Sequence, residues 1–276
     1  MNFFTLKNGA LSAQIAPEKG ATLVQLSRDN LDFLYMDPEN LVSDERPRCG
    51  VPFLFPIFGR LKDKTYTWNG KTYHMDIHGF AHTSPWTVVR AQEDCLELLL
   101  QSTPETLAQY PFPFRMVMTY RLSDEALQIH VRFENTGSEA LPYSFGFHPY
   151  FLVRDLPGAR VEARAAAQVD FSSGKAIPFG QGELSLTIPQ GAPEAGAALV
   201  GLESPTVLAL PGEGRLITLK YSYNLPQLVL WTQAGKDFLC VEPINGSADS
   251  LNTGKYMTLE PGEAREVYLT LCPERI

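Results

Sequence analysis

Short runs of alternating apolar and polar residues are the feature that most constrains the fold of this chain. Leu127–Glu134 reads LQIHVRFE, so every second side chain of an extended strand would point to one apolar face. Arg115–Leu122 reads RMVMTYRL and is separated from that run by Ser123-Asp124-Glu125. The two runs therefore predict an antiparallel hairpin with one buried face and one wet face.

Similar runs recur along the chain between turn signals such as Asn69-Gly70, Pro211-Gly212 and Pro261-Gly262. Because no strand–helix–strand alternation is visible, we expect an all-β fold of antiparallel sheets packed as a sandwich, with few short helices. The further predicted strands are Cys95–Gln101, Leu184–Ile188, Leu216–Tyr221, Leu228–Thr232, Phe238–Glu242 and Val267–Cys272.

Two other segments carry a different prediction. Thr103–Tyr110 should form a helical turn, because Thr103 can accept a hydrogen bond from the first backbone amides. Pro189–Gly201 is rich in Ala, Gly and Pro, and we expect it to be a surface loop. We find no domain boundary or internal repeat, so residues 1–276 are expected to form one domain.

The charge and the cysteines narrow the class of protein. The formal net charge is -8 and the basic residues form no block, which disfavours a nucleic-acid partner and an anionic membrane surface. The N-terminus lacks a signal-peptide pattern and no run approaches a membrane span, so we expect a cytoplasmic protein. Cys49, Cys95, Cys240 and Cys272 form no C-x-x-C pair and are expected to be buried, reduced thiols.

Arg48–Lys62 departs from a plain strand. Pro52 and Pro56 interrupt this apolar segment and exclude a regular central strand, and Arg60 places a cation just after it. The segment is either a packed crossing with a surface arginine or part of a binding site.

Asp76–Trp86 contains two histidines, His78 and His82, at the spacing of metal ligands on a helix. Gly79 and the Ser84-Pro85 pair instead predict a loop, and no third ligand suggests itself. A metal site is therefore not favoured here.

Two titratable residues lie in strongly apolar surroundings. His148 follows several aromatic residues, and Pro149 predicts that it ends a strand or forms a turn. Glu242 ends the apolar run FLCVE, where half-burial would raise its pKa towards the range of a general base. His148 could equally be a hydrogen-bonded core residue, and Glu242 a sheet-edge residue in water.

Four segments together resemble the aldose 1-epimerase, or galactose mutarotase-like, family. They are FPIFGRL at 55–61, HGFAHTSPW at 78–86, FGFHPYF at 145–151 and VEPINGSADSLNTG at 241–254. They occur in the family's order, and most of the chain lies between the first and the last. The chain is most similar to the shorter bacterial branch, which includes epimerase-like proteins of lactose operons.

The resemblance implies a β-supersandwich with a concave sugar-binding face and a mutarotase activity that needs no metal, nucleotide or redox cofactor. Glu242 then matches the family's catalytic base and His148 its general acid. His78 matches a second active-site histidine and Arg60 a substrate-contacting arginine. An aromatic residue such as Phe147 or Trp231 would pack against the sugar ring.

The substrate is left open by two departures from the family pattern. His82 stands where many members have an arginine. This difference argues against the alternative function of a hexose-6-phosphate 1-epimerase, since a neutral histidine anchors an anion poorly. Local cations that could replace it are Arg48, Arg60 and Lys62. The family's substrate-binding aspartate has no clear match, although Asp170 could stand in its place.

The expected partner is a small-molecule hexose such as galactose or glucose, with the chain a monomer or a homodimer. Two alternatives to a mutarotase remain. A non-catalytic carbohydrate-binding protein on the same fold would not need His148 and Glu242 together. A glycoside-active enzyme would need two carboxylates, and Asp249 is a distant second to Glu242.

Overall fold

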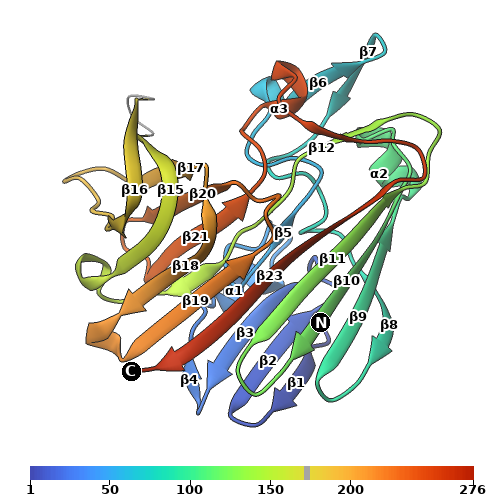
Figure 1. The fold of residues 1–276 in the computed structure, drawn as a ribbon. Coiled ribbons are helices and arrows are strands. Elements are labelled where there is room, and N and C mark those ends of the chain that lie inside the picture. The colour runs from blue at the N-terminus through green and yellow to red at the C-terminus, as the bar shows by residue number, and fades with distance from the viewer. Residues whose placement is uncertain (171–174) are drawn as a thin grey trace.

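The computed structural model describes residues 1–170 and 175–276 and is built almost entirely of β-strands (Figure 1). Each pairing between its named strands is antiparallel. The all-β fold class predicted from the alternating runs is confirmed, and the helices are short.

The N-terminal strands form a separate four-stranded sheet, in the order β1-β2-β3-β4. Figure 1 shows this sheet below the long strands of the C-terminal half. Its strands are β1 (Phe4–Asn8), β2 (Leu11–Ala16), β3 (Thr22–Arg28) and β4 (Leu31–Asp32).

Most other strands belong to one large sheet with the order β5-β13-β21-β20-β17-β15-β18-β19-β23-β11-β10-β9-β8, while β14 adds to β21 and β16 to β15. Neighbours in this order are often far apart in sequence, so the sheet joins the middle of the chain to its C-terminus. The strands are β5 (Phe53–Leu54), β8 (Thr87–Ala91), β9 (Cys95–Gln101), β10 (Phe114–Leu122), β11 (Leu127–Asn135), β13 (Gly146–Phe147), β14 (Tyr150–Leu152), β15 (Arg160–Asp170), β16 (Ala176–Leu184), β17 (Glu194–Val200), β18 (Glu203–Leu210), β19 (Arg215–Tyr221), β20 (Gln227–Gln233), β21 (Phe238–Ile244) and β23 (Ala264–Arg275).

Two small sheets, β6-β7 and β12-β22, and several short helices complete the described fold. Asn69 and Gly70 both have positive φ at the tip of the β6-β7 hairpin, as their sequence predicts. The bounds are β6 (Thr65–Trp68), β7 (Lys71–His74), β12 (Leu141–Tyr143), β22 (Met257–Leu259), α1 (Pro38–Val42), α2 (Pro104–Gln109) and α3 (Ser250–Thr253), with 3-10 turns η1 (Lys62–Lys64), η2 (Leu156–Gly158) and η3 (Pro211–Glu213).

The alternating strands bury the face that their sequence marks as apolar. In β11, Leu127, Ile129, Val131 and Phe133 are each at most 1% exposed, and they belong to a core that also draws residues from the first sheet. β10 and β11 pair in the predicted hairpin, with Leu122 opposite Leu127. The predicted helical turn is α2, whose N-cap Thr103 makes a capping box with Thr106.

Two predictions about the middle of the chain are wrong. Leu184–Ile188 was predicted as a strand, but the strand in this region is β16, which ends at Leu184. β16 contains Pro and Gly residues, which an edge strand tolerates. Pro189–Gly201 is not wholly a loop, because Glu194–Val200 forms β17 between β15 and β20. Hydrogen bonding to two neighbouring strands outweighs the weak strand propensity of Ala and Gly.

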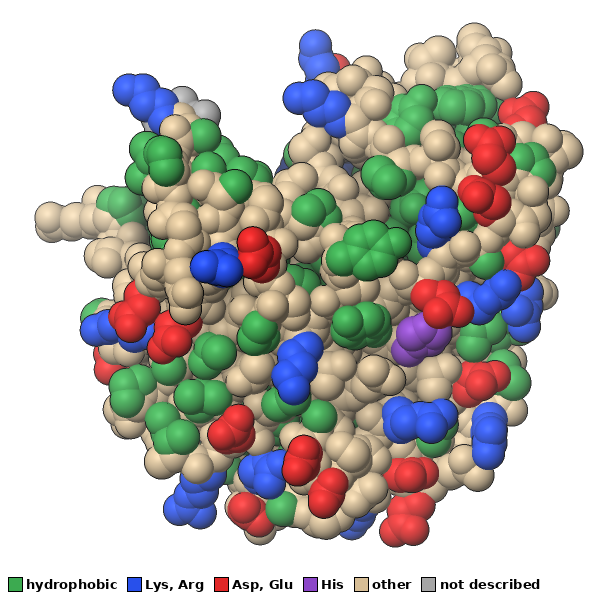
Figure 2. Space-filling model, viewed as in Figure 1, with side chains coloured by type: hydrophobic (Ala, Val, Ile, Leu, Met, Phe, Trp, Pro, Cys, Tyr) green, Lys and Arg blue, Asp and Glu red, His purple; other side chains and the backbone are tan. Residues whose placement is uncertain are grey.

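The surface agrees with the charge pattern of the sequence. On the face seen in Figure 2, acidic and basic side chains are interspersed, and no basic patch interrupts them. Within the described residues, no helix has the length and apolar character that crossing a membrane requires.

Candidate active site

A cleft of about 520 Å³ lies over β17, β20 and β21, which are neighbouring strands towards the β5 end of the large sheet. Loop residues at 46–48, 58–60, 77–78 and 246–248 form its other walls. Most side chains that the sequence and its resemblance single out meet here. Those lining the cleft are Arg60, His78, His148, Trp231 and Glu242.

The prediction that the Phe147 ring could pack against a sugar is wrong. Its side chain is 0% exposed, does not line the cleft, and packs 5.2 Å from the ring of Phe53. The cause is the strand alternation: His148 points to the cleft, so its neighbour points to the core.

One antiparallel register brings His148 and Glu242 together. Gly146 pairs with Ile244, and Tyr150 pairs with Cys240 on the other side of Pro149. The same register carried through Pro149 sets His148 opposite Glu242, where side chains on one face of a sheet approach closely. Two strand segments thus fix the relative position of the pair.

The pair is close and almost completely buried. His148 Nε2 lies 3.4 Å from Glu242 Oε2, and the residues are 5% and 2% exposed. The His148 ring stacks on Tyr150, with centroids 4.6 Å apart and planes at 8°. Its Nδ1 is buried without a hydrogen-bond partner among the described residues, so the ring is oriented by stacking and by Glu242.

Burial works against the charged form of both members. It raises the pKa of Glu242 well above its ordinary value, and the nearby Arg46 charge offsets this only in part. Burial, with a further contribution from Arg46, lowers the pKa of His148 to about 3. An imidazolium–carboxylate pair and a neutral pair differ by one proton moved across the 3.4 Å contact, and both have no net charge.

His78 is held by a reciprocal contact with Gly59. The Gly59 amide donates to His78 Nδ1 at 3.1 Å, and the His78 amide donates to the Gly59 carbonyl at 2.8 Å. His78 has a left-handed φ of 69°, and Gly79 follows at 71°, where a Cβ would lie 2.3 Å from the Phe55 carbonyl oxygen. Because Nδ1 accepts, the neutral ring carries its proton on Nε2.

His78 also contacts His148, one member of the buried pair. Its ring meets that of His148 edge to face at 5.4 Å. Burial, followed by the neighbouring His148, lowers the pKa of His78 well below its ordinary value. His78 is therefore a neutral hydrogen-bond donor at the wall of the cleft.

The cleft contains more charge than the sequence analysis anticipated. Arg46, Arg48 and Arg60 all line it, and none of the three forms an ion pair with a described residue. Lys62, which the sequence analysis grouped with Arg48 and Arg60, does not line it. Arg46 was missed, although its position two residues before Arg48 could have indicated it.

Trp231 brings in a second missed residue. Its indole N–H donates to Glu194 Oε2 at 3.1 Å, and both residues line the cleft. Glu194 is the first residue of β17, the strand that was predicted to be a loop because of its Ala and Gly content. The indole is thereby held with its ring against the cleft.

Two predicted residues remain outside this arrangement. His82 is 2% exposed, lies in a loop and does not line the cleft, although its ring is 6.1 Å from that of His78. Burial lowers its pKa to about 3. Asp170 ends β15, and its side chain lies outside the part of the chain that the structure describes.

The described residues contain one group whose atoms could approach a metal ion. His148, Cys240 and Glu242 each offer an atom within 4.8 Å of the others. Burial raises the pKa of the Cys240 thiol well above its ordinary value, so it keeps its proton and is a poor ligand. The thiol packs with Tyr150 and Phe238 instead.

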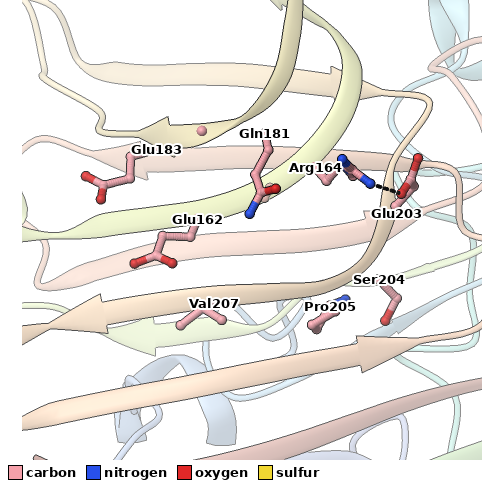
Figure 3. A pocket seen from close by; sticks show the side chains of 10 residues that line it. Glu162, Arg164, Gln181, Glu183, Glu203, Ser204, Pro205 and Val207 are labelled. Carbon is pink, nitrogen blue, oxygen red and sulfur yellow. Dashed lines mark ion pairs between the residues drawn. The ribbon is translucent and has the colours of Figure 1, made fainter.

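Another hollow of similar size, about 510 Å³, lies over β15, β16 and β18, none of which lines the cleft (Figure 3). It contains Arg164, paired with Glu203 at 3.5 Å, and the carboxylates of Glu162 and Glu183. It holds no histidine, and its charged side chains are exposed. Of these two hollows, the cleft over β20 and β21 is the one lined by a histidine in contact with a carboxylate.

Known proteins share this architecture over the full chain. The Slr1438 protein from Synechocystis sp. PCC 6803 is 29% identical, with a TM-score of 0.90 over 100% of this chain and 96% of its own. A galactose mutarotase-like protein from Lactobacillus casei ATCC 334 is 26% identical, with a TM-score of 0.84 over 99% and 100%.

A relative with a named reaction is the putative glucose-6-phosphate 1-epimerase of Cenchrus ciliaris, which is 26% identical over 78% of this chain and 67% of its own. The family model described as aldose 1-epimerase matches residues 2–272. Together with the antiparallel supersandwich and its sugar-sized cleft, this match shows that the chain belongs to the aldose 1-epimerase family.

Proposed function

We propose that this protein interconverts the α and β anomers of a free hexose by opening and closing its pyranose ring. The observation that carries the proposal is the buried His148–Glu242 pair, 3.4 Å apart in the wall of the cleft. A binding protein has no need of an acid and a base on one ligand, and keeping both out of water costs stability.

The reaction requires two proton transfers. In the imidazolium–carboxylate form, Glu242 removes the proton of the anomeric hydroxyl while His148 delivers one to the ring oxygen. The C1–O5 bond breaks and a carbonyl forms at C1. After rotation about C1–C2 the transfers reverse, the ring closes as the other anomer, and the protein regains its starting protonation.

Three residues would hold the sugar for these steps. His78 Nε2–H and the Arg60 guanidinium would donate to hydroxyl groups, since His78 Nδ1 is already occupied by Gly59. The Trp231 ring, oriented by Glu194, would pack against the apolar face of the pyranose. These contacts fix the ring relative to the acid and the base.

A second candidate is the 1-epimerisation of a hexose 6-phosphate. Arg46, Arg48 and Arg60 supply three guanidiniums without carboxylate partners among the described residues, which is a favourable setting for a phosphate. The relative from Cenchrus ciliaris carries that activity in its name. The absence of an arginine at His82 bears less on this candidate than the sequence suggested, because His82 does not line the cleft.

Two-dimensional exchange NMR of the anomeric protons tests both candidates. We expect enzyme-dependent cross-peaks between the α and β signals of galactose or glucose. Faster exchange for glucose 6-phosphate, lost in Arg46→Gln and Arg48→Gln variants, would support the second candidate. Sugar binding without exchange for all three compounds would contradict both candidates and identify a non-catalytic carbohydrate-binding protein.

A further inference from the structure

The cleft does not end at the catalytic pair but adjoins a second hollow of about 310 Å³. Arg48 and Gln233 line both hollows, so the two meet at these side chains. The second hollow lies beside α1 and the end of β20, and it contains none of the residues to which the proposed reaction assigns a role. It extends the binding surface beyond one hexose ring.

Aromatic side chains run from one hollow into the other. Trp231 lines the cleft, and its ring is 5.4 Å from Phe238. Phe238 is in turn 5.3 Å from Tyr35, and these two rings line the second hollow. Tyr35 is only partly buried, so its ring offers a surface on which the apolar face of a second pyranose can pack.

The charges of the second hollow disfavour an anion. Asp37, Glu39 and Glu45 line it and outnumber its two cations, Arg48 and Lys236, and Asp37 engages Lys236 at 3.5 Å. Three carboxylates would repel a phosphate, whereas hydroxyl groups can donate to them and accept from Lys236 and the Asn40 amide. A neutral, hydroxyl-rich group therefore fits this hollow, and the arginine-lined cleft remains the place for any anion.

We propose that the second hollow is a subsite for a glycosyl unit attached to the reacting hexose, so that the preferred substrate is a reducing disaccharide. This inference rests on the proposed anomerase activity. The reducing ring would lie against the His148–Glu242 pair with its anomeric hydroxyl free, and the second ring would lie on Tyr35. The proton transfers are unchanged, and the glycosidic bond between the rings stays intact.

Anomer exchange rates compare the subsite with the cleft directly. The probes are maltose, lactose and melibiose against glucose, and β-1,4-galactobiose against galactose. Because a stacked aromatic contact contributes roughly a factor of ten, we expect kcat/KM for at least one disaccharide to exceed that of its reducing-end hexose about tenfold. If every disaccharide is slower than its hexose, the subsite does not exist.

Variants that touch only the second hollow sharpen the test. Tyr35→Ala should lower the disaccharide kcat/KM about tenfold and leave the hexose value within about twofold, whereas Tyr35→Phe keeps the ring and should stay near the parent. Tyr223→Ala is the matched control, because Tyr223 is 96% exposed and lines neither hollow. Lys236→Ala, at an exposed position that folding tolerates, should cost the disaccharide about threefold.

The outcomes separate the subsite from the proposed reaction. Equal losses for hexose and disaccharide in Tyr35→Ala, or no loss for either, would overturn the subsite. Hexose exchange without a disaccharide advantage removes the subsite and leaves the proposed reaction standing. No catalysed exchange for any sugar removes both.

Discussion

Two histidine–carboxylate pairs in this protein share one separation and differ in their surroundings. His148 Nε2 lies 3.4 Å from Glu242 Oε2, and His130 Nε2 lies 3.4 Å from Glu266 Oε2. The first pair has side chains 7% and 3% exposed, the second 34% and 63%. Both span neighbouring antiparallel segments, so strand geometry alone does not distinguish the two pairs.

The difference shows what solvent does to a pair of titratable groups. Water solvates both members of the His130–Glu266 pair, so it contributes on the order of 0–1 kcal/mol to stability. Burial of the other pair destabilises its ionised forms, because it lowers the pKa of His148 and raises the pKa of Glu242. Exclusion of water therefore distinguishes two pairs that have the same interatomic distance.

The largest expected contrast is catalytic. Glu242→Gln and His148→Asn should each reduce the catalysed anomer exchange at least ~100-fold, because each removes one of the two proton transfers. Glu266→Gln and His130→Asn, the same substitutions in the exposed pair, should leave the rate within about twofold. Exchange NMR measures all four variants, and near-parent rates in the first two would disprove the assigned roles.

The second contrast concerns the acid stability of buried histidines. The folded-state pKa values of His82 and His148 are about 3, against an ordinary value of 6.5. Their contribution to the free energy of unfolding is therefore fully present above pH 6.5 and is lost as the pH falls towards 3. Each steepens the fall in the free energy of unfolding by up to about 1.4 kcal/mol per pH unit. Urea unfolding between about pH 7 and about pH 5 measures that slope.

His82 is the position to change, because it lies outside the cleft. His82→Gln should make the slope shallower than in the parent. An unchanged slope in His82→Gln would mean that this histidine is protonated in the folded protein, contrary to its burial.

The third contrast is the stability cost of the buried carboxyl group. The folded-state pKa of Glu242 is raised above the ordinary value of 4.5. Its contribution to the free energy of unfolding is therefore present below pH 4.5 and is lost as the pH rises through the folded-state pKa. At neutral pH, Glu242→Gln should therefore raise the free energy of unfolding by about 1 kcal/mol while removing activity. Glu266→Gln should change it by less than about 0.5 kcal/mol.

The same urea titrations repeated in acid check the sign of this effect. Below pH 4.5 the carboxyl group is protonated in folded and unfolded chains, so the advantage of Glu242→Gln should disappear. A loss of stability in Glu242→Gln at neutral pH would show that the ionised carboxylate is favoured in the wall.

The smallest effect belongs to the exposed pair alone. A double-mutant cycle of His130→Asn and Glu266→Gln, below the ordinary histidine pKa, should give a coupling of about 0.5 kcal/mol or less. Added salt at about 1 M should abolish it, since the Debye length falls to about 3 Å. A salt-resistant coupling of several kcal/mol would make the two pairs alike and remove the contrast.

Strands with clean alternation were predictable from sequence. In β11 the period of two names the buried face residue by residue, and the turn at Ser123-Asp124-Glu125 sets the hairpin register. β17 was not predictable, because Ala and Gly carry no alternation and only its two neighbouring strands hold it extended. Because β17 was not predicted, Glu194, which orients Trp231, was not identified as a site residue.

Within the site, the sequence by itself determined the residue types and the likeness of four segments to one family, and so pointed to His148, Glu242, His78 and Arg60. Only the tertiary structure decided that Phe147 faces the core and that Arg46 reaches the cleft. It also decided that the His148–Glu242 pair is buried whereas the His130–Glu266 pair is exposed to solvent. The physical reason is that burial and pairing arise from strands far apart in sequence, and these set pKa values that no local pattern encodes.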